Sequence, residues 1–210
     1  MVVQAPLRSG LVGFVVAGGL SSRMGQDKAL LAWRGTTLLD HALARLDAVC
    51  AEVRILCGPT ERYGDRGRTL VLDAASDGAV PSGPLAGLAA GLASAGEKAG
   101  LFLGVDLPGV PVALLEALAA AAADDIDAVV PVTTEGPEPL CALYEPRCLP
   151  AVRARLVSGD RRMTAFWPDV RVRTLQGAAL AEFGDPGAIF HNVNAPEDYR
   201  DANRHATEGA

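Results

Sequence analysis

Residues 14–28 constrain the fold more than any other part of this 210-residue chain. The segment opens with the apolar run Phe-Val-Val, breaks at Gly18 and Gly19, and then presents Arg23 and Lys28. A continuous apolar run is typical of a buried parallel strand, and ligands of open α/β sheets bind where such strands end. Free backbone amides and nearby positive charge suit phosphate groups. The segment therefore predicts a nucleoside triphosphate site at the carboxyl end of a first strand, although a turn with solvated charges would use the same residue types.

Two common phosphate-binding loops do not fit this segment. Lys28 follows Asp27 and precedes Ala29, so the pattern Gly-x-x-x-x-Gly-Lys-Ser/Thr is absent, and so is Gly-x-Gly-x-x-Gly. The phosphate-binding prediction therefore rests on the glycine pair and the two cations.

Further apolar runs alternate with helical patterns along the rest of the chain. Half of the residues are hydrophobic, which suits one α/β domain with a substantial core. Two strands joined by a helix indicate a βαβ unit. Strands are expected at residues 11–16, 53–57, 69–72, 100–105, 128–132, 138–144 and 170–175, and helices at 38–49, 84–92, 114–122 and 148–157.

Charge and cysteine content exclude several classes of protein. The formal net charge of −6 argues against a broad nucleic-acid surface. The 4 cysteines form no Cys-x-x-Cys pair, so buried reduced thiols are expected rather than a structural zinc, which indicates a reducing compartment. No apolar run is long enough for a membrane helix, and a convincing signal peptide is absent. A cytoplasmic protein without membrane contact is the expectation.

Two aspartates and a glycine mark further candidate site positions. Asp106 ends the apolar run before Pro108, where it could cap the next helix or, with phosphates and waters, bind Mg²⁺. Asp73 follows residues 69–72, where a turn or cap role and a ligand contact both remain open. Gly83 precedes Pro84 at a predicted helix start, and exposed amides at such a terminus attract anions.

At several of these positions the sequence resembles a known family. Ala17-Gly18-Gly19-x-Ser21-x-Arg23-Met24-Gly25-x-Asp27-Lys28 is similar to the signature of the small nucleotidyltransferases. Within that superfamily the chain is most similar to the molybdenum cofactor guanylyltransferases, which join GMP to molybdopterin. The other family-like stretches are Gly83-Pro84-Leu85-Ala86-Gly87, Asp106-x-Pro108, Pro139-Leu140-x-Ala142-Leu143 and Asn192-x-Asn194-x-Pro196-Glu197-Asp198.

The resemblance implies a three-layer, Rossmann-like α/β fold, with a mostly parallel central sheet and helices on both faces. It implies a single nucleotidyltransferase domain over residues 1–210, with a nucleotide-binding half at about 11–135, an acceptor-binding half at about 136–200 and short flexible tails. The implied reaction is transfer of GMP from GTP to molybdopterin, which releases diphosphate. Transient contact with molybdenum cofactor synthesis proteins or apo-molybdoenzymes is also implied.

The resemblance also implies a role for each candidate residue. Asp106 would bind Mg²⁺, for which Mn²⁺ could substitute, and Asp106, Lys28 and Arg23 would be catalytic. Asn192 and Asn194 would contact the acceptor. The implied nucleotide contacts are Val16, Ala17, Gly18, Gly19, Lys28, Asp73, Gly83 and Asp106.

Base choice is where this sequence departs from its relatives. Relatives usually offer an asparagine or similar polar residue just after the second strand, whereas this chain has Leu-Cys-Gly-Pro at residues 56–59. Guanine would then be read by main-chain groups. The alternatives are a cytidylyltransferase acting on molybdopterin or another small phosphorylated acceptor, and a catalytically silent nucleotide-binding protein, against which the retention of Lys28 and Asp106 counts.

Overall fold

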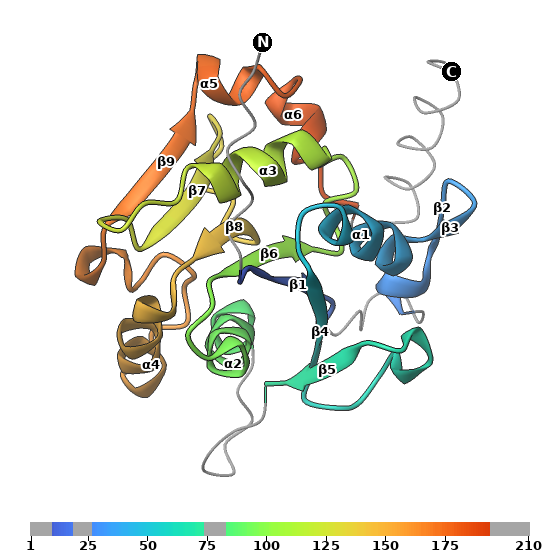
Figure 1. Ribbon diagram of the computed structural model, residues 1–210, viewed down its shortest axis with the longest axis horizontal. Helices are drawn as coiled ribbons and strands as arrows, with labels where there is room; N and C mark the ends of the chain where they lie inside the picture. The colour runs from blue at the N-terminus through green and yellow to red at the C-terminus, as the bar shows by residue number, and fades with distance from the viewer. Residues whose placement is uncertain (1–9, 19–26, 74–82, 194–210) are drawn as a thin grey trace.

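The computed structural model describes residues 10–18, 27–73 and 83–193 (Figure 1). In these segments a seven-stranded sheet has the strand order β5-β4-β1-β6-β8-β7-β9, and a separate two-stranded sheet pairs β2 with β3. The strands of the large sheet are β1 (Val12–Val16), β4 (Glu52–Gly58), β5 (Thr69–Leu72), β6 (Gly100–Gly104), β7 (Ala128–Val132), β8 (Cys141–Tyr144) and β9 (Val172–Gln176). The small sheet contains β2 (Ala32–Trp33) and β3 (Thr36–Thr37).

The large sheet is parallel except at β8. Strand β1 pairs in parallel with both β4 and β6, β4 with β5, and β7 with β9. Strand β8 lies between β6 and β7 and is antiparallel to both. Strands β5, β4, β1 and β6 therefore end at one edge of the sheet, which positions the candidate site.

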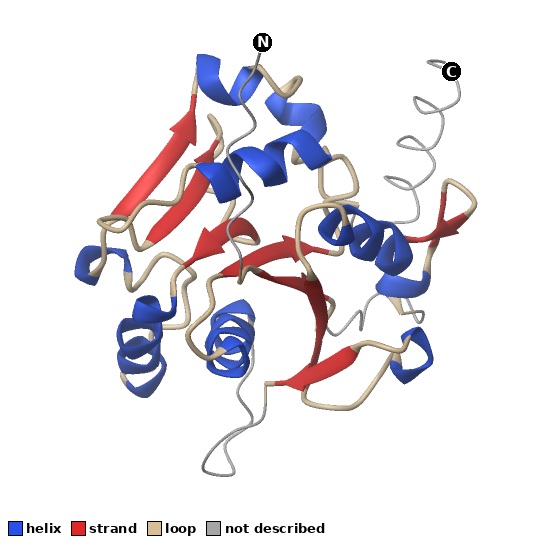
Figure 2. Cartoon of the chain, viewed as in Figure 1, coloured by secondary structure: helices blue, strands red, loops and turns tan. Residues whose placement is uncertain are grey.

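Helices cover both faces of the sheet, so the three-layer α/β prediction is confirmed (Figure 2). One face packs against α1 (Leu38–Asp47), α3 (Val112–Ala120) and the short helices α5 (Ala178–Ala181) and α6 (Pro186–Ile189). The other face packs against α2 (Pro84–Ala95) and α4 (Leu149–Val157). Four 3₁₀ turns complete the described elements: η1 (Lys28–Leu30), η2 (Gly64–Arg66), η3 (Pro146–Cys148) and η4 (Trp167–Asp169).

Successive side chains of β1 point to opposite faces of the sheet and so contribute to both hydrophobic layers. Phe14 faces α2 and α4, whereas Val15 faces α1 and α3, and both are fully buried. Phe14 stacks on Phe102, its register partner on β6, with ring centroids 4.8 Å apart. Tyr144 on β8 meets Phe102 edge-on at 5.6 Å, which extends this aromatic row across the antiparallel strand.

All seven strands predicted for the large sheet are present, but the β2–β3 hairpin and the short helices α5 and α6 were not predicted, and β8 begins later than expected. The β2–β3 hairpin was not predicted, because each of its strands has only two residues. Strand β8 begins at Cys141 rather than at Glu138, because Cys141 N donates to Glu138 O across a turn (3.0 Å). Thr37 is the N-cap of α1, and its hydroxyl accepts a hydrogen bond from Asp40 N.

Two further expectations concern thiols and membrane helices. All four cysteines are buried and free, as predicted. Within the described segments, no helix combines the length and apolar character required to span a bilayer.

Candidate active site

The candidate site lies at the edge where β5, β4, β1 and β6 end. Backbone hydrogen bonds join neighbouring strand ends there: Ala17 N donates to Leu56 O (2.9 Å), and Val105 N donates to Val16 O (3.1 Å). Asp73 N donates to Gly58 O (3.2 Å), which fixes the end of β5 beside β4. The predicted residues therefore lie at or just beyond the strand ends along one edge of the sheet: Val16 ends β1, Ala17 and Gly18 follow it, Asp73 follows β5, and Asp106 follows β6.

Packing against Gly58 explains why position 18 is a glycine, and the sequence alone does not reveal this contact. A Cβ atom on Gly18 would lie 2.9 Å from Gly58 N, and a Cβ atom on Gly58 would lie 3.0 Å from Gly18 O. Gly58 also has a φ of +81°, a conformation that L side chains rarely adopt. The close approach that requires glycine at position 18 is therefore to the backbone of Gly58.

Asp106 and Lys28 meet across the site. Lys28 Nζ lies 3.3 Å from Asp106 Oδ2, and their side chains are 15% and 26% exposed. Asp106 lies two residues beyond β6, and its Oδ1 atom occupies space that a Cβ on Gly104 would reach at 2.6 Å. Gly104 therefore allows the carboxylate to fold back over the strand end, facing the lysine.

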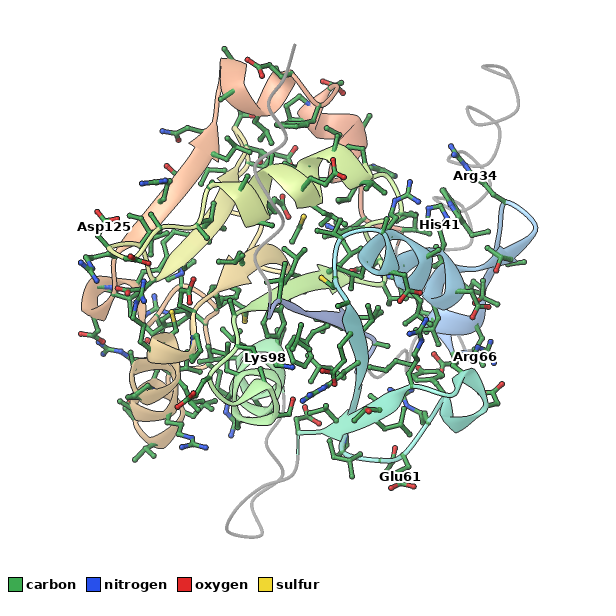
Figure 3. All side chains as sticks on the ribbon, in the orientation of Figure 1. Arg34, His41, Glu61, Arg66, Lys98 and Asp125 are labelled. Atoms are coloured by element: carbon green, nitrogen blue, oxygen red, sulfur yellow. The ribbon has the colours of Figure 1, made fainter. Side chains whose placement is uncertain are left out.

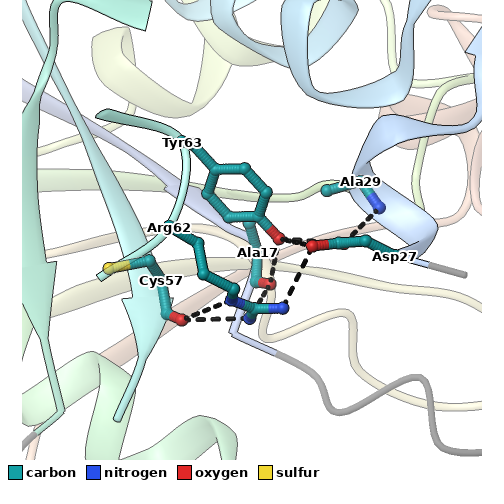
Figure 4. Close-up of polar contacts among 6 residues, drawn as sticks. All are labelled: Ala17, Asp27, Ala29, Cys57, Arg62 and Tyr63. Carbon is teal, nitrogen blue, oxygen red and sulfur yellow. Dashed lines mark hydrogen bonds and ion pairs between the residues drawn. The ribbon is translucent and has the colours of Figure 1, made fainter. Parts of the chain in front are cut away.

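A polar network holds the residue that precedes Lys28 (Figure 4). The Asp27 carboxylate accepts hydrogen bonds from Ala29 N (3.1 Å), Tyr63 Oη (2.8 Å) and Arg62 Nη1 (3.1 Å). Arg62 Nη2 also donates to Ala17 O (3.2 Å) and Cys57 O (3.0 Å). Arg62 and Tyr63 were not among the predicted site residues, since nothing in the local sequence distinguishes them from solvated loop residues.

Asp73 keeps one carboxylate oxygen without a partner among the described residues. Its Oδ1 atom is buried and accepts no hydrogen bond from any residue that the structure describes. Burial raises the pKa of Asp73, and the positive charge of Arg62 opposes that shift only in part. An acceptor in this state can receive a hydrogen bond from a ligand donor.

Glu138 is a further acidic group near Asp106 that was not among the predicted site residues. Burial, followed by the charges of Glu135 and Asp106, raises the pKa of Glu138 to about 7. Two backbone hydrogen bonds hold the segment around Glu138 beside the end of β6: Gly104 N donates to Leu140 O (2.8 Å), and Glu138 N donates to Pro131 O (2.9 Å). The only signal in the sequence was its place at the start of the family-like Pro-Leu stretch.

The loop after Asp106 is fastened to α1. His41 Nε2 lies 3.2 Å from Pro108 O, and Arg45 Nε donates to Val110 O. Burial and then the charge of Arg45 lower the pKa of His41 to about 4, so its ring is neutral near pH 7. Figure 3 shows His41 on the same flank of the molecule as Arg34, whose guanidinium lies 5.8 Å from the Trp33 ring centroid.

Of the remaining predicted site residues, the structure describes Gly83 and Asn192. Gly83 is the N-cap of α2 with a φ of +109°, and Pro84 occupies the first turn, as predicted. Asn192 is exposed and precedes Val193, whose amide donates to Asp106 O (3.1 Å). Gly19, Arg23 and Asn194 lie outside the described residues.

The donor chemistry of the site fits a hard divalent cation. Asp106 offers carboxylate oxygens, which Mg²⁺ and Mn²⁺ accept, and phosphate groups and waters can complete the coordination. The described segments contain no group of three or more His, Cys, Asp or Glu residues placed to bind a metal ion. Within these segments Asp106 would therefore bind such an ion together with phosphate groups and waters.

Comparison with known proteins gives three results. Residues 13–173 match the model of the MobA-like NTP transferase domain. The molybdenum cofactor guanylyltransferase of Desulfosudis oleivorans is 33% identical over 193 residues, which cover 91% of this chain and 94% of that protein. The molybdopterin-guanine dinucleotide biosynthesis protein A of Archaeoglobus fulgidus has a TM-score of 0.76 at 22% identity, with 94% and 99% of the two chains covered.

A Mycobacterium tuberculosis protein of the same fold has been solved in complex with manganese. Its TM-score is 0.55 at 19% identity, and the match covers 92% of this chain and 98% of that one. At this identity the match shows the shared fold.

Proposed function

We propose, from the premise that this chain belongs to the MobA-like NTP transferase family, that it transfers GMP from GTP to molybdopterin and releases diphosphate. The observation that carries the proposal is the Lys28–Asp106 pair at the carboxyl ends of the parallel strands. Residues from about 11–135 would bind the nucleotide, and residues from about 136–200 would bind the acceptor, within one domain over residues 1–210.

The reaction needs positioning and charge neutralisation rather than a protein nucleophile. A terminal phosphate oxygen of molybdopterin attacks the α-phosphorus of GTP in line, the bond from that phosphorus to its bridging oxygen breaks, and diphosphate leaves. The attacking phosphate is already an anion near neutral pH, so no protein base is required. Lys28 and Arg23 would stabilise the charge that develops on the phosphates.

Asp106 is the proposed protein ligand of Mg²⁺, with Mn²⁺ as a substitute; the ion would neutralise charge on the triphosphate when it is bound. The manganese complex of the M. tuberculosis fold relative supports a divalent cation in this fold. Asp106 would hold the ion, and Lys28, whose amine lies 3.3 Å from Asp106, would contact a phosphate oxygen.

The base and the acceptor would bind on either side of these groups. Val16, Ala17, Gly18, Gly19, Asp73 and Gly83 are the further proposed nucleotide contacts, and Asn192 and Asn194 are the proposed acceptor contacts. Asp73 Oδ1 is a buried acceptor without a partner among the described residues, so it suits a base with N–H donors. Guanine presents two such donors side by side on its Watson–Crick edge, N1–H and N2–H₂, whereas cytosine presents only N4–H₂, so the acceptor favours guanine.

The proposed cellular setting follows from the reaction. Small-molecule substrates would be GTP and molybdopterin, with transient contact to molybdenum cofactor synthesis proteins or apo-molybdoenzymes, in the cytoplasm. Nucleic acid and membranes are not proposed partners.

The first test is nucleotide preference in the presence of Mg²⁺. GTP at 100 times its Kd would stabilise the folded state by about 2.7 kcal/mol, whereas CTP, UTP and ATP at the same concentration would shift Tm much less. A larger shift with CTP would replace the proposal with a cytidylyltransferase.

The second test is formation of the dinucleotide product and diphosphate from GTP and molybdopterin. Lys28→Ala should lower kcat by about 10²–10³-fold if the lysine stabilises transition-state charge. A protein that binds GTP but forms no product would be a silent nucleotide-binding relative.

A further inference from the structure

The Asp27 carboxylate is the most completely bonded acid at the candidate site. Both of its oxygens lie within hydrogen-bond distance of Tyr63 Oη, at 2.9 Å and 2.8 Å. Oδ2 also accepts from Arg62 Nη1 (3.1 Å), and Oδ1 accepts from Ala29 N (3.1 Å). Two side chains from residues 60–68 thus converge on one carboxylate 35 and 36 positions earlier in the chain.

Asp27 in turn sets the start of the turn that carries Lys28. It is the N-cap of η1, where its side chain accepts the Ala29 amide, and Lys28 is the first residue of that turn. The Lys28 amine then reaches Asp106 at 3.3 Å. A continuous chain of contacts therefore runs from Arg62 and Tyr63 through Asp27 to the lysine that faces the metal ligand.

Arg62 and Tyr63 are themselves held rigidly. The Arg62 guanidinium donates to Cys57 O and Ala17 O, at the ends of β4 and β1, and lies 5.1 Å from the Tyr63 ring centroid. Tyr63 is buried and has a φ of +69°, which costs a non-glycine residue about 1 kcal/mol. The hydrogen bonds from its hydroxyl to Asp27 offset that strain.

We propose that Arg62 and Tyr63 are positioning residues, which act on nucleotidyl transfer by holding Asp27 and thereby orienting Lys28 toward Asp106. The inference rests on the proposed function, because it assigns Lys28 a part in the transfer step. The competing explanation is that the two residues only hold the loop at residues 60–68 in place.

The first experiment measures kcat and the KM for GTP in the Tyr63→Phe and Arg62→Lys proteins. Tyr63→Phe keeps the buried ring and removes only the hydroxyl, and we expect kcat to fall about five- to tenfold with KM changed less than about twofold. Arg62→Lys keeps the charge but loses the fork that spans three acceptors, so we expect a similar loss. Arg66→Lys is the matched control, since Arg66 lies in the same loop but binds Asp40 (2.9 Å), and its kcat should not change.

A double-mutant cycle then separates action through Lys28 from loop stability. In the Lys28→Ala protein, adding Tyr63→Phe should change kcat by less than about twofold, because the group it positions is gone. Full additivity of the two substitutions would overturn the inference, and so would equal losses in the Tyr63→Phe and Arg66→Lys proteins.

A measurement that does not depend on enzyme activity tests this inference separately from the proposed function. The rate of Lys28 acetylation by acetic anhydride, followed by mass spectrometry, should rise a few-fold in Tyr63→Phe and stay unchanged in Arg66→Lys. An unchanged rate in Tyr63→Phe overturns the positioning role. A raised rate together with a normal kcat for Lys28→Ala would keep the positioning role and remove Lys28 from the proposed mechanism.

Discussion

The Asp127 carboxylate, where β7 begins, has more hydrogen-bond partners than the Asp106 carboxylate, which follows β6 at the opposite edge of the sheet. Asp127 precedes β7 and is 7% exposed, and its oxygens accept from Arg171 N (2.7 Å) and from the Arg147 guanidinium. Burial alone would raise the pKa of Asp127, but the Arg171 amide and the two guanidiniums outweigh it, so the pKa is lowered. Asp106 follows β6, at the other edge, and its one hydrogen bond between described side chains is the long contact with Lys28.

The difference separates acids that stabilise the fold from acids left available for ligands. Asp73 retains a buried oxygen without a partner among the described residues, and burial raises the pKa of Glu138. Groups in this state reduce the stability of the free protein, whereas the saturated Asp127 contributes to it. Under the proposed function, Asp73 and Asp106 gain further partners when substrate and metal are bound, whereas Asp27 is already bonded at both oxygens.

The largest expected effect is on turnover. Asp106→Ala should lower kcat by about 10³-fold or more, because the proposed metal–triphosphate complex loses its protein ligand. Steady-state assays with GTP, Mg²⁺ and molybdopterin measure this. Asp169→Ala, which removes an exposed partner of Arg155, is the control and should turn over normally. Near-normal activity of Asp106→Ala would contradict the metal assignment.

The second effect is on folding, at the other edge. Asp127→Ala should lower the free energy of unfolding by about 2–4 kcal/mol, since it leaves the Arg171 amide and two guanidiniums without their common acceptor. Urea unfolding gives the value, and kcat of the folded variant should match the wild type. A large loss of kcat at unchanged stability would break the distinction between the two edges.

The third expected effect is on GTP binding and concerns Asp73. Asp73→Asn should weaken GTP binding about tenfold, because the base loses a charged acceptor, while kcat changes little. Isothermal titration gives the affinity. Stability of the free variant at pH 8 should rise, because the raised pKa of Asp73 means that its charge disfavours the folded state. Lower stability with unchanged GTP affinity would place Asp73 with the structural acids.

The smallest effect concerns the pH dependence of stability at Glu138. Its folded pKa of about 7 lies above the ordinary value of 4.5, so the folded state binds the extra proton, and stability is lost as pH rises through this window. Glu138→Gln should remove that loss and be more stable than the wild type by about 1–2 kcal/mol at pH 8 in EDTA. The two proteins should have nearly equal stability at pH 4.5. Urea titrations across this range test the sign, and a less stable variant at pH 8 would show that Glu138 has a stabilising partner.

Local sequence patterns predicted most strands because burial on both faces demands continuous apolar runs such as Val12–Val16 and Gly100–Gly104. The position of β8 between β6 and β7 was beyond those patterns, since pairing order depends on contacts between distant segments. The same limit applies to the site. Asp106 could be predicted as a candidate from the strand that precedes it, whereas Arg62 and Tyr63 contact Asp27 across 35 and 36 positions and leave no local signal. Gly18 was identified for a ligand contact, but its close packing on Gly58 becomes visible only when β1 and β4 are adjacent.

Because all four thiols are buried, the rate at which they are alkylated measures how readily the folded protein opens. Burial raises the pKa of both Cys50 and Cys148 to about 12, so the thiolates that react with an alkylating agent are rare in the folded protein at pH 8. Alkylation must then pass through molecules that have opened, and its rate reports the population or the rate of opening. Cys148 lies in the layer with α2 and α4, whereas Cys50 lies in the layer with α1 and α3. Peptide mapping after a brief pulse of iodoacetamide would therefore reveal whether the two layers open together or one before the other.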